Sequence, residues 1–103
     1  MSITSNLSDD QMTVTIKVAG RFDFSTHQDF VQSYKSFPKG EKSYVVDLAS
    51  AEYMDSSAMG MLLQLREYNR SGESVVLANG NEAVVDVLQI ANFGKLFTIK
   101  NPK

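Results

Sequence analysis

The side chains best suited to chemistry lie in one short stretch, Asp55-Ser56-Ser57, which joins an apolar run to a long helical pattern. Each of the three can accept hydrogen bonds from the free N–H groups at the start of a helix. A serine on such a turn is also exposed, so a modifying enzyme can reach its hydroxyl. The stretch therefore fits two interpretations, a well-capped helix start and a modification site.

The helix that follows carries apolar residues on more than one side. With a 3.6-residue period its main apolar stripe faces a sheet, whereas Met59 and Leu63 lie elsewhere, on the side of Ser56. These two residues predict either a surface that contacts a partner or the filling of a second groove in the core. Gly60 has no capping or turn role within this helix, where glycine costs about 1 kcal/mol relative to alanine. We expect another backbone, from the fold or from a partner, to approach it closely.

Other reactive groups are scarce. No cysteine is present and His27 is the single histidine, which excludes disulfides, thiolate zinc sites and multi-histidine metal sites. Ser56 is not part of a G-x-S-x-G nucleophile elbow, and no Gly-rich phosphate-binding loop occurs. Asp23 and Asp55 are better explained as turn and cap residues than as a catalytic pair. The sequence therefore predicts a protein that is not an enzyme and that holds neither a metal nor a cofactor.

The composition is that of a single globular domain: 103 residues, of which 43% are hydrophobic and 21% charged. The formal net charge of −2 leaves no basic excess to neutralise nucleic-acid phosphates. The longest unbroken apolar run, residues 75–78, is far shorter than the roughly 20 residues that span a bilayer. Residues 1–10 lack the basic start and apolar stretch of a secretory signal. We therefore expect a cytoplasmic protein that binds neither nucleic acid nor membrane.

The elements that position these residues follow from hydrophobic periodicity. Ser25 and Gln28 have the spacing of a capping box, which predicts that the first helix starts at Ser25. The nearly all-apolar residues 44–48 predict a central strand covered on both faces. The expected strands are 3–7, 12–18, 44–48, 75–78 and 96–99, and the expected helices run from 25 to about 37, from 57 to about 70 and from 82 to 91. This order, β-β-α-β-α-β-α-β, predicts one α/β domain over residues 1–103, with a mixed, mostly parallel sheet and helices packed on it.

Four segments carry a resemblance to a known family. Residues 55–60, DSSAMG, resemble the D-S-S-G-hydrophobic-G signature of the STAS domain, as found in bacterial anti-sigma factor antagonists. Residues 20–23, GRFD, are similar to the family's G-hydrophilic-hydrophobic-D turn, and residues 44–48, YVVDL, to its central strand. Residues 92–97, NFGKLF, resemble its closing hydrophobic run. The sequence departs from the pattern in having alanine where many members have the signature's first glycine, and many members carry a further helix after the last strand.

The resemblance implies a phosphorylation-controlled partner switch in signal transduction and transcription regulation. In this family a serine kinase, often an anti-sigma factor with a GHKL-type ATPase fold, phosphorylates the first serine of the signature. A metal-dependent serine phosphatase reverses the modification, and only the dephosphorylated form binds the partner. The phosphoacceptor implied here is Ser56. The expected partner-binding residues, from the resemblance and from the helix pattern, are Asp23, Asp55, Ser57, Met59 and Leu63.

A second interpretation keeps the fold and the interface but has no phosphorylation cycle. The chain would then be a non-switching STAS interaction subunit of a transporter or of a larger signalling assembly. The intact Asp55-Ser56-Ser57 stretch favours the switch, because a purely structural module needs no exposed serine there. In either case we expect the chain to be a monomer.

Overall fold

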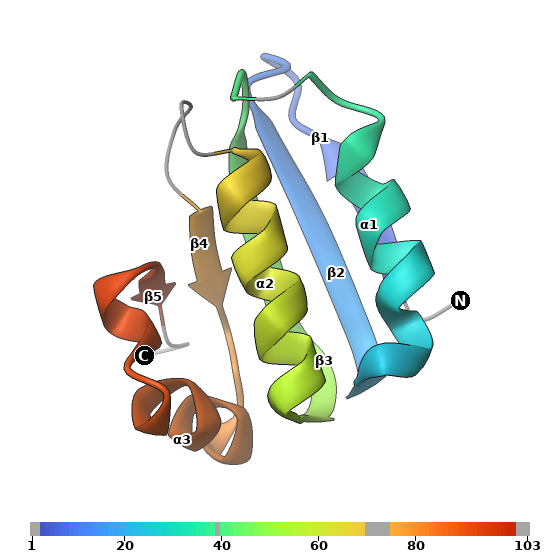
Figure 1. Cartoon of the computed structure of the whole chain (residues 1–103). Coiled ribbons are helices and arrows are strands. Elements are labelled where there is room, and N and C mark those ends of the chain that lie inside the picture. The colour runs from blue at the N-terminus through green and yellow to red at the C-terminus, as the bar shows by residue number, and fades with distance from the viewer. Residues whose placement is uncertain (1–2, 39, 70–74, 101–103) are drawn as a thin grey trace.

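The computed structural model describes residues 3–38, 40–69 and 75–100 of the protein (Figure 1). Within these residues the elements follow one another in the order expected from the sequence, with two short 3-10 helices added. In chain order they are β1 (Ile3–Leu7), β2 (Thr13–Phe22), η1 (Phe24–Thr26), α1 (His27–Lys35), β3 (Ser43–Met54), α2 (Ser56–Tyr68), β4 (Val75–Ala78), α3 (Glu82–Ile90), η2 (Phe93–Lys95) and β5 (Thr98–Lys100).

The strands form one mixed sheet in the order β1-β2-β3-β4-β5. β1 pairs with β2 in antiparallel fashion, as a hairpin requires, with Ile3 opposite Val18. The pairs β2–β3, β3–β4 and β4–β5 are parallel. Parallel neighbours need a crossover connection, and α1, α2 and α3 supply a helix in each of the three. The predicted fold class, a small α/β domain with a mostly parallel sheet, is confirmed.

Helices α1 and α2 lie side by side over β2 and β3 and cover one face of the sheet (Figure 1). In β3 the side chains of Tyr44, Val46 and Leu48 are buried on this face. Val45 and Asp47 alternate with them and are only half-buried. The expectation that this strand is covered on both faces is therefore wrong. Its residues alternate in burial, as in a sheet with one covered face, although the sequence reads as continuously apolar.

The hydrophobic core lies between this face of the sheet and the helices. The apolar stripe predicted on the second helix is confirmed, because four of its residues are buried and the fifth is half-buried. The four are Ala58, Met61, Leu62 and Leu65, and the fifth is Tyr68. Burying a side chain such as leucine or phenylalanine contributes about 1.5–3 kcal/mol, so this layer accounts for much of the driving force for folding. The buried residues of α1 and α2 are Phe30, Tyr34, Ala58, Met61, Leu62 and Leu65.

Strand β2 is longer than the sequence predicts. The alternating pattern predicts a strand over residues 12–18 that is closed by Gly20, but the strand continues to Phe22. Gly20 has a φ of 80°, in the left-handed region that glycine adopts without strain, and the pairing of β2 with β3 shifts register next to it. Beyond this bulge Phe22 pairs with Met54, so β2 and β3 end at the same place. The segments that follow the two strands are thereby brought together.

The C-terminal part also differs from the prediction. Strand β5 begins at Thr98, two residues later than expected. The rings of Phe93 and Phe97 are buried with their centroids 5.2 Å apart, so Phe97 belongs to the core and precedes the strand. The second helix ends at Tyr68, about two residues before its expected end near residue 70, a position that itself lies outside the described residues. None of the helices in the described part of the chain is long and apolar enough to span a membrane.

Candidate partner-binding site

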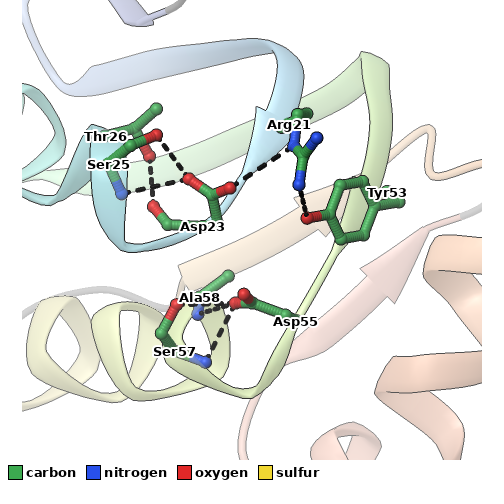
Figure 2. A network of polar contacts seen from close by, with 8 residues as sticks. All are labelled: Arg21, Asp23, Ser25, Thr26, Tyr53, Asp55, Ser57 and Ala58. Carbon is green, nitrogen blue, oxygen red and sulfur yellow. Dashed lines mark hydrogen bonds and ion pairs between the residues drawn. The ribbon is translucent and has the colours of Figure 1, made fainter.

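Two turns lie next to each other where β2 and β3 end. Phe22 and Met54, the last residues of the two strands, are partners in the parallel register. The N–H of Asp55 donates to the carbonyl oxygen of Phe22 at 3.4 Å and joins the two strand ends. Neighbouring strands are about 4.7–4.9 Å apart. Figure 2 shows the resulting arrangement, in which residues 23–26 face residues 55–58 across this edge of the sheet.

Asp55 is the N-cap of helix α2. Its Oδ1 accepts hydrogen bonds from the N–H groups of Ser57 and Ala58, at 3.0 and 3.2 Å, and from the Ser57 hydroxyl at 2.6 Å. These bonds satisfy N–H groups that have no partner within the helix. The predicted helix start is confirmed, and the role of each residue is now defined: Asp55 is the cap and Ser56 is the first helical residue.

Ser56 is exposed, and no other described residue forms a hydrogen bond with its hydroxyl. Its neighbour differs in this respect, because the Ser57 hydroxyl is held by the carboxylate of Asp55. The sequence offers two adjacent serines as acceptors of a modification. The structure distinguishes them, because the Ser57 hydroxyl is bound by Asp55 and Ser56 is exposed.

Asp23 forms the second turn in the same way. Its Oδ1 accepts a hydrogen bond from the Ser25 N–H at 3.0 Å and another from the Ser25 hydroxyl. The Thr26 hydroxyl donates to the Asp23 carbonyl oxygen at 2.8 Å. The predicted capping box of Ser25 and Gln28 is therefore wrong. Because β2 continues to Phe22, Asp23 becomes the cap, and Ser25 binds it from within the first turn.

Hydrogen bonds hold both carboxylates in the charged form. The pKa of Asp55 lies below its ordinary value mainly because the Ser57 hydroxyl donates to it, and the N–H groups of Ala58 and Ser57 act in the same direction. The pKa of Asp23 is lowered foremost by the Ser25 hydroxyl. The charge of Asp23 by itself raises the pKa of Asp55, so the two carboxylates are within electrostatic reach of each other. A third negative charge at this edge would meet repulsion from both.

The sequence analysis missed two residues beside this pair. The guanidinium of Arg21 donates to the Tyr53 hydroxyl at 2.7 Å and lies 5.0 Å from the centre of the tyrosine ring. Its Nε is 3.5 Å from Oδ2 of Asp23 (Figure 2). The Arg21 side chain is 68% exposed and that of Asp23 is 18% exposed, so solvent screens the ion pair from the arginine side. Only the register after the bulge, which pairs Arg21 with Tyr53, could have revealed this contact, and the sequence does not show the bulge.

The two apolar residues predicted for the partner surface lie in different environments. Leu63 is 40% exposed, which fits a contact surface. Met59 is half-buried and packs against the core, so the core alternative applies to it in part. A Cβ added to Gly60 would meet no atom of the described structure within 4 Å. The expected close approach from within the fold is therefore wrong, and only approach by a partner remains as a prediction.

A third residue that the sequence analysis missed is Phe24, the first residue after Asp23. Its side chain is 67% exposed, and its ring stacks on the ring of His27 with centroids 4.9 Å apart and planes 15° from parallel. The signal was present in the sequence, because Asp23-Phe24-Ser25 and Asp55-Ser56-Ser57 share the pattern Asp-x-Ser. Within the described ranges, no group of three or more His, Asp and Glu side chains could hold a metal ion.

Several solved structures share the fold. Protein TM1081 of Thermotoga maritima has a TM-score of 0.81 at 19% identity, with 96% of this chain and 86% of that chain covered. SpoIIAA, an anti-sigma factor antagonist solved in its unphosphorylated form, has a TM-score of 0.76 at 19% identity over 97% of this chain and 89% of its own. An anti-sigma factor antagonist from Mycobacterium paratuberculosis has a TM-score of 0.74 at 19% identity, with 99% and 87% covered. At this identity the similarity establishes the fold.

Sequence comparison establishes the family. The family model described as "Mlab, STAS domain" matches residues 5–98. A STAS-domain containing protein of Pseudomonas aeruginosa, strain UCBPP-PA14, is 46% identical over 101 residues, which are 96% of this chain and 99% of that protein. Because the family model covers most of the chain and the relative spans nearly all of both proteins, this protein belongs to the STAS-domain family.

Proposed function

We propose that this STAS domain is a phosphorylation-controlled protein-binding switch of the anti-sigma factor antagonist kind. Its unphosphorylated form binds a regulatory partner, and phosphorylation of the Ser56 hydroxyl releases that partner. The observation that carries the proposal is the Ser56 hydroxyl, exposed and without a hydrogen bond to any described residue, beside the carboxylates of Asp55 and Asp23. Two of the similar structures, SpoIIAA and the Mycobacterium paratuberculosis protein, are anti-sigma factor antagonists, which supports the same kind of function here.

The fold can accept a phosphate at this position. A phosphoserine carries about −1.5 to −2 charges, and the N-terminus of a helix attracts negative charge through its free N–H groups and its dipole. Ser56 is the first residue of α2, a helix of 13 residues. Its side chain takes no part in the core, so the modification displaces no packed group. Phosphorylation therefore changes the surface and leaves the core intact.

The same phosphate is unfavourable once a partner covers it. Burial removes the water that screens its charge from Asp55 and Asp23, and the carboxylates then repel it more strongly. Like charges brought together at an interface cost several kcal/mol, which corresponds to a hundredfold or greater loss of affinity. One hydroxyl can thus control binding while folding is unaffected. The partner-facing surface includes Asp23, Asp55, Ser57, Leu63 and the exposed part of Met59.

The partners that fit this switch are proteins. The binding partner is an anti-sigma factor or a serine kinase of the GHKL type, and a metal-dependent serine phosphatase restores the binding form. The cycle takes place in the bacterial cytoplasm and its output is transcription regulation. The chain itself needs no cofactor and catalyses no step, because it contributes only the acceptor hydroxyl and the binding surface.

The test compares two variants at Ser56. Ser56→Ala should bind the partner permanently, whereas Ser56→Glu, which places a negative charge at the same position, should bind at least about a hundredfold more weakly. Ser5→Glu is the matched control, because Ser5 is exposed on β1. The substitution adds the same charge at a position that belongs to neither of the two turns. The partner is isolated with the Ser56→Ala form, identified, purified and titrated against each variant. Mass spectrometry of protein from its native host should find one phosphate on Ser56.

Equal affinity of the Ser56→Ala and Ser56→Glu forms would contradict the switch. The second interpretation, a non-switching interaction subunit, would then apply, because it requires the interface but no control by charge. Loss of binding in Ser5→Glu to the same extent would show that the effect is one of net charge and does not arise at the site.

A further inference from the structure

The two turns at the edge of the sheet repeat one local structure. In each, an extended aspartate caps the first turn, and the serine two residues later donates both its N–H and its hydroxyl to that carboxylate. The backbone angles φ and ψ of the caps agree, at −141° and −173° for Asp23 and −118° and −173° for Asp55. The residue between cap and serine is exposed in both turns. It is Ser56 in one and Phe24 in the other.

The strand register places the two turns that carry these exposed residues next to each other. Phe24 comes two residues after Phe22, and Ser56 comes two residues after Met54. Phe22 and Met54 are partners on parallel strands, and the hydrogen bond from the Asp55 N–H to the Phe22 carbonyl oxygen joins the two strand ends. The two turns therefore start one strand spacing apart, about 5 Å, at the Phe22–Met54 pair. A protein surface that covers the Ser56 hydroxyl therefore also meets Phe24.

Phe24 has the properties of an anchor residue. A phenylalanine that is 67% exposed contributes nothing to the core, and its stacking on His27 restricts the ring before any partner binds. Restricted aromatic side chains lose little conformational entropy on binding. Beside the ring lies a groove of about 580 Å³, whose lining residues are Phe24, Ser25, His27, Gln28, Val31 and Gln32.

The charges at this edge indicate what the partner must offer. Hydrogen bonds from their own turns reach Oδ1 of Asp23 and of Asp55, which both stay charged, and the exposed residues that follow them are an aromatic one and an uncharged serine. The exposed ring of Phe24 is complementary to an apolar pocket, and the carboxylates beside it disfavour a pocket that carries negative charge. A phosphate on Ser56 would have to lose its water next to that pocket, which burial of a charge makes costly.

We infer that Phe24, stacked on His27, is the apolar anchor and a specificity-determining residue of the partner interface, and that it inserts into an uncharged hydrophobic pocket adjoining the partner surface that covers Ser56. This inference rests on the proposed function. It assigns the two turns separate roles: Phe24 supplies affinity for the partner, and the phosphorylation state of Ser56 determines whether the partner can bind.

The test measures binding in the Ser56→Ala background, with the purified protein that the Ser56→Ala form retains as the probe. Adding Phe24→Ala should weaken binding by about thirtyfold or more, the loss typical of truncating a central aromatic anchor, and Phe24→Leu should weaken it less. Adding Ile90→Ala, which truncates an apolar side chain of α3 that is 87% exposed, is the matched control and should leave the affinity within about twofold. Thermal melting of each variant shows that the fold is unchanged.

A second measurement tests direct contact. A photo-reactive benzoylphenylalanine at position 24 should crosslink to the partner, the same residue at position 90 should not, and Ser56→Glu should abolish the crosslink. Unchanged affinity of the Phe24→Ala form, or equal crosslinking from both positions, would overturn the inference and leave the switch standing. Failure of Ser56→Ala to retain any partner, or equal binding by Ser56→Ala and Ser56→Glu, would overturn the proposed function and the inference with it.

Discussion

At the scale of single residues, the core holds one polar atom whose position has a measurable cost. Tyr44 is fully buried at the start of β3, and within the described residues its hydroxyl has no hydrogen-bond partner. Burial, with smaller contributions from Tyr68 and Tyr34, raises the pKa of Tyr44 to about 12. A buried hydroxyl without a partner loses its hydrogen bonds to water on folding, at a cost of about 1–3 kcal/mol.

We predict that Tyr44→Phe keeps or increases the stability of the domain at neutral pH and reduces its sensitivity to alkali. The unfolded chain releases the tyrosine proton near pH 10, whereas the folded protein retains it to about pH 12. The stability of the unsubstituted protein should therefore decrease by about 1.4 kcal/mol per pH unit in this window, beyond any decrease in the variant. Urea unfolding at pH 7, 10 and 11.5 measures both effects. Parallel pH profiles for the two proteins would show that the hydroxyl does not titrate late.

At the scale of elements, helix α2 carries a defect that the fold does not require. Gly60 lies in the interior of the helix, on its exposed side, and the space where a Cβ would be is empty in the described structure. Glycine at such a position destabilises a helix by about 0.5–1 kcal/mol relative to alanine. The position lies one turn after Ser56, on the surface that we assign to the partner. The absence of a side chain there is explained if the partner backbone approaches α2 at this point.

We predict that Gly60→Ala raises the melting temperature by about 2–8 °C, as expected for a gain of about 0.5–1 kcal/mol in a domain of this size. In the Ser56→Ala background the same substitution should weaken partner binding, because the added methyl group holds the partner backbone away from α2. Thermal denaturation and titration of the partner measure the two effects separately. A stabilised variant with unchanged affinity would mean that Gly60 has no role in the interface.

Features of the elements that depend on nearby residues follow from the sequence, whereas features that depend on pairing between distant strands do not. The periodicity of residues 57–68 predicts the buried stripe of α2, and the third helix begins at residue 82 as expected, where Asn81 is the cap. Both signals are local. The length of β2 is not local, since it depends on a bulge at Gly20 and on pairing with a strand about 30 residues later. The role of Asp23 depends on that length, because this residue directly follows the strand and caps the 3-10 helix η1 that precedes α1. A local capping-box signal at Ser25 was therefore misleading, and the pairing of the two Asp-x-Ser turns was not foreseen.

At the scale of the whole molecule, the core and the candidate site occupy separate regions. The buried layer lies between the helices and one face of the sheet, whereas the two turns lie where β2 and β3 end (Figure 1). Ser56 is exposed at the start of α2 and is not a member of the buried layer. This separation allows a change of charge at the surface without a change of packing, which a switch based on affinity requires.

The last prediction follows from this separation. The dipole of α2 and its free N–H groups attract a phosphate on Ser56 by about 0.3–1 kcal/mol, and repulsion from the adjacent Asp55, screened by solvent, opposes this by a similar amount. Phosphorylated and unmodified protein should therefore melt within a few degrees of each other, and their amide NMR spectra should differ only around residues 53–63 and the turn at Asp23. Spectral changes throughout the domain, or a loss of several kcal/mol in stability, would show that phosphorylation remodels the fold. Release of the partner would then result from unfolding of its binding surface, and repulsion at the interface would not be its cause.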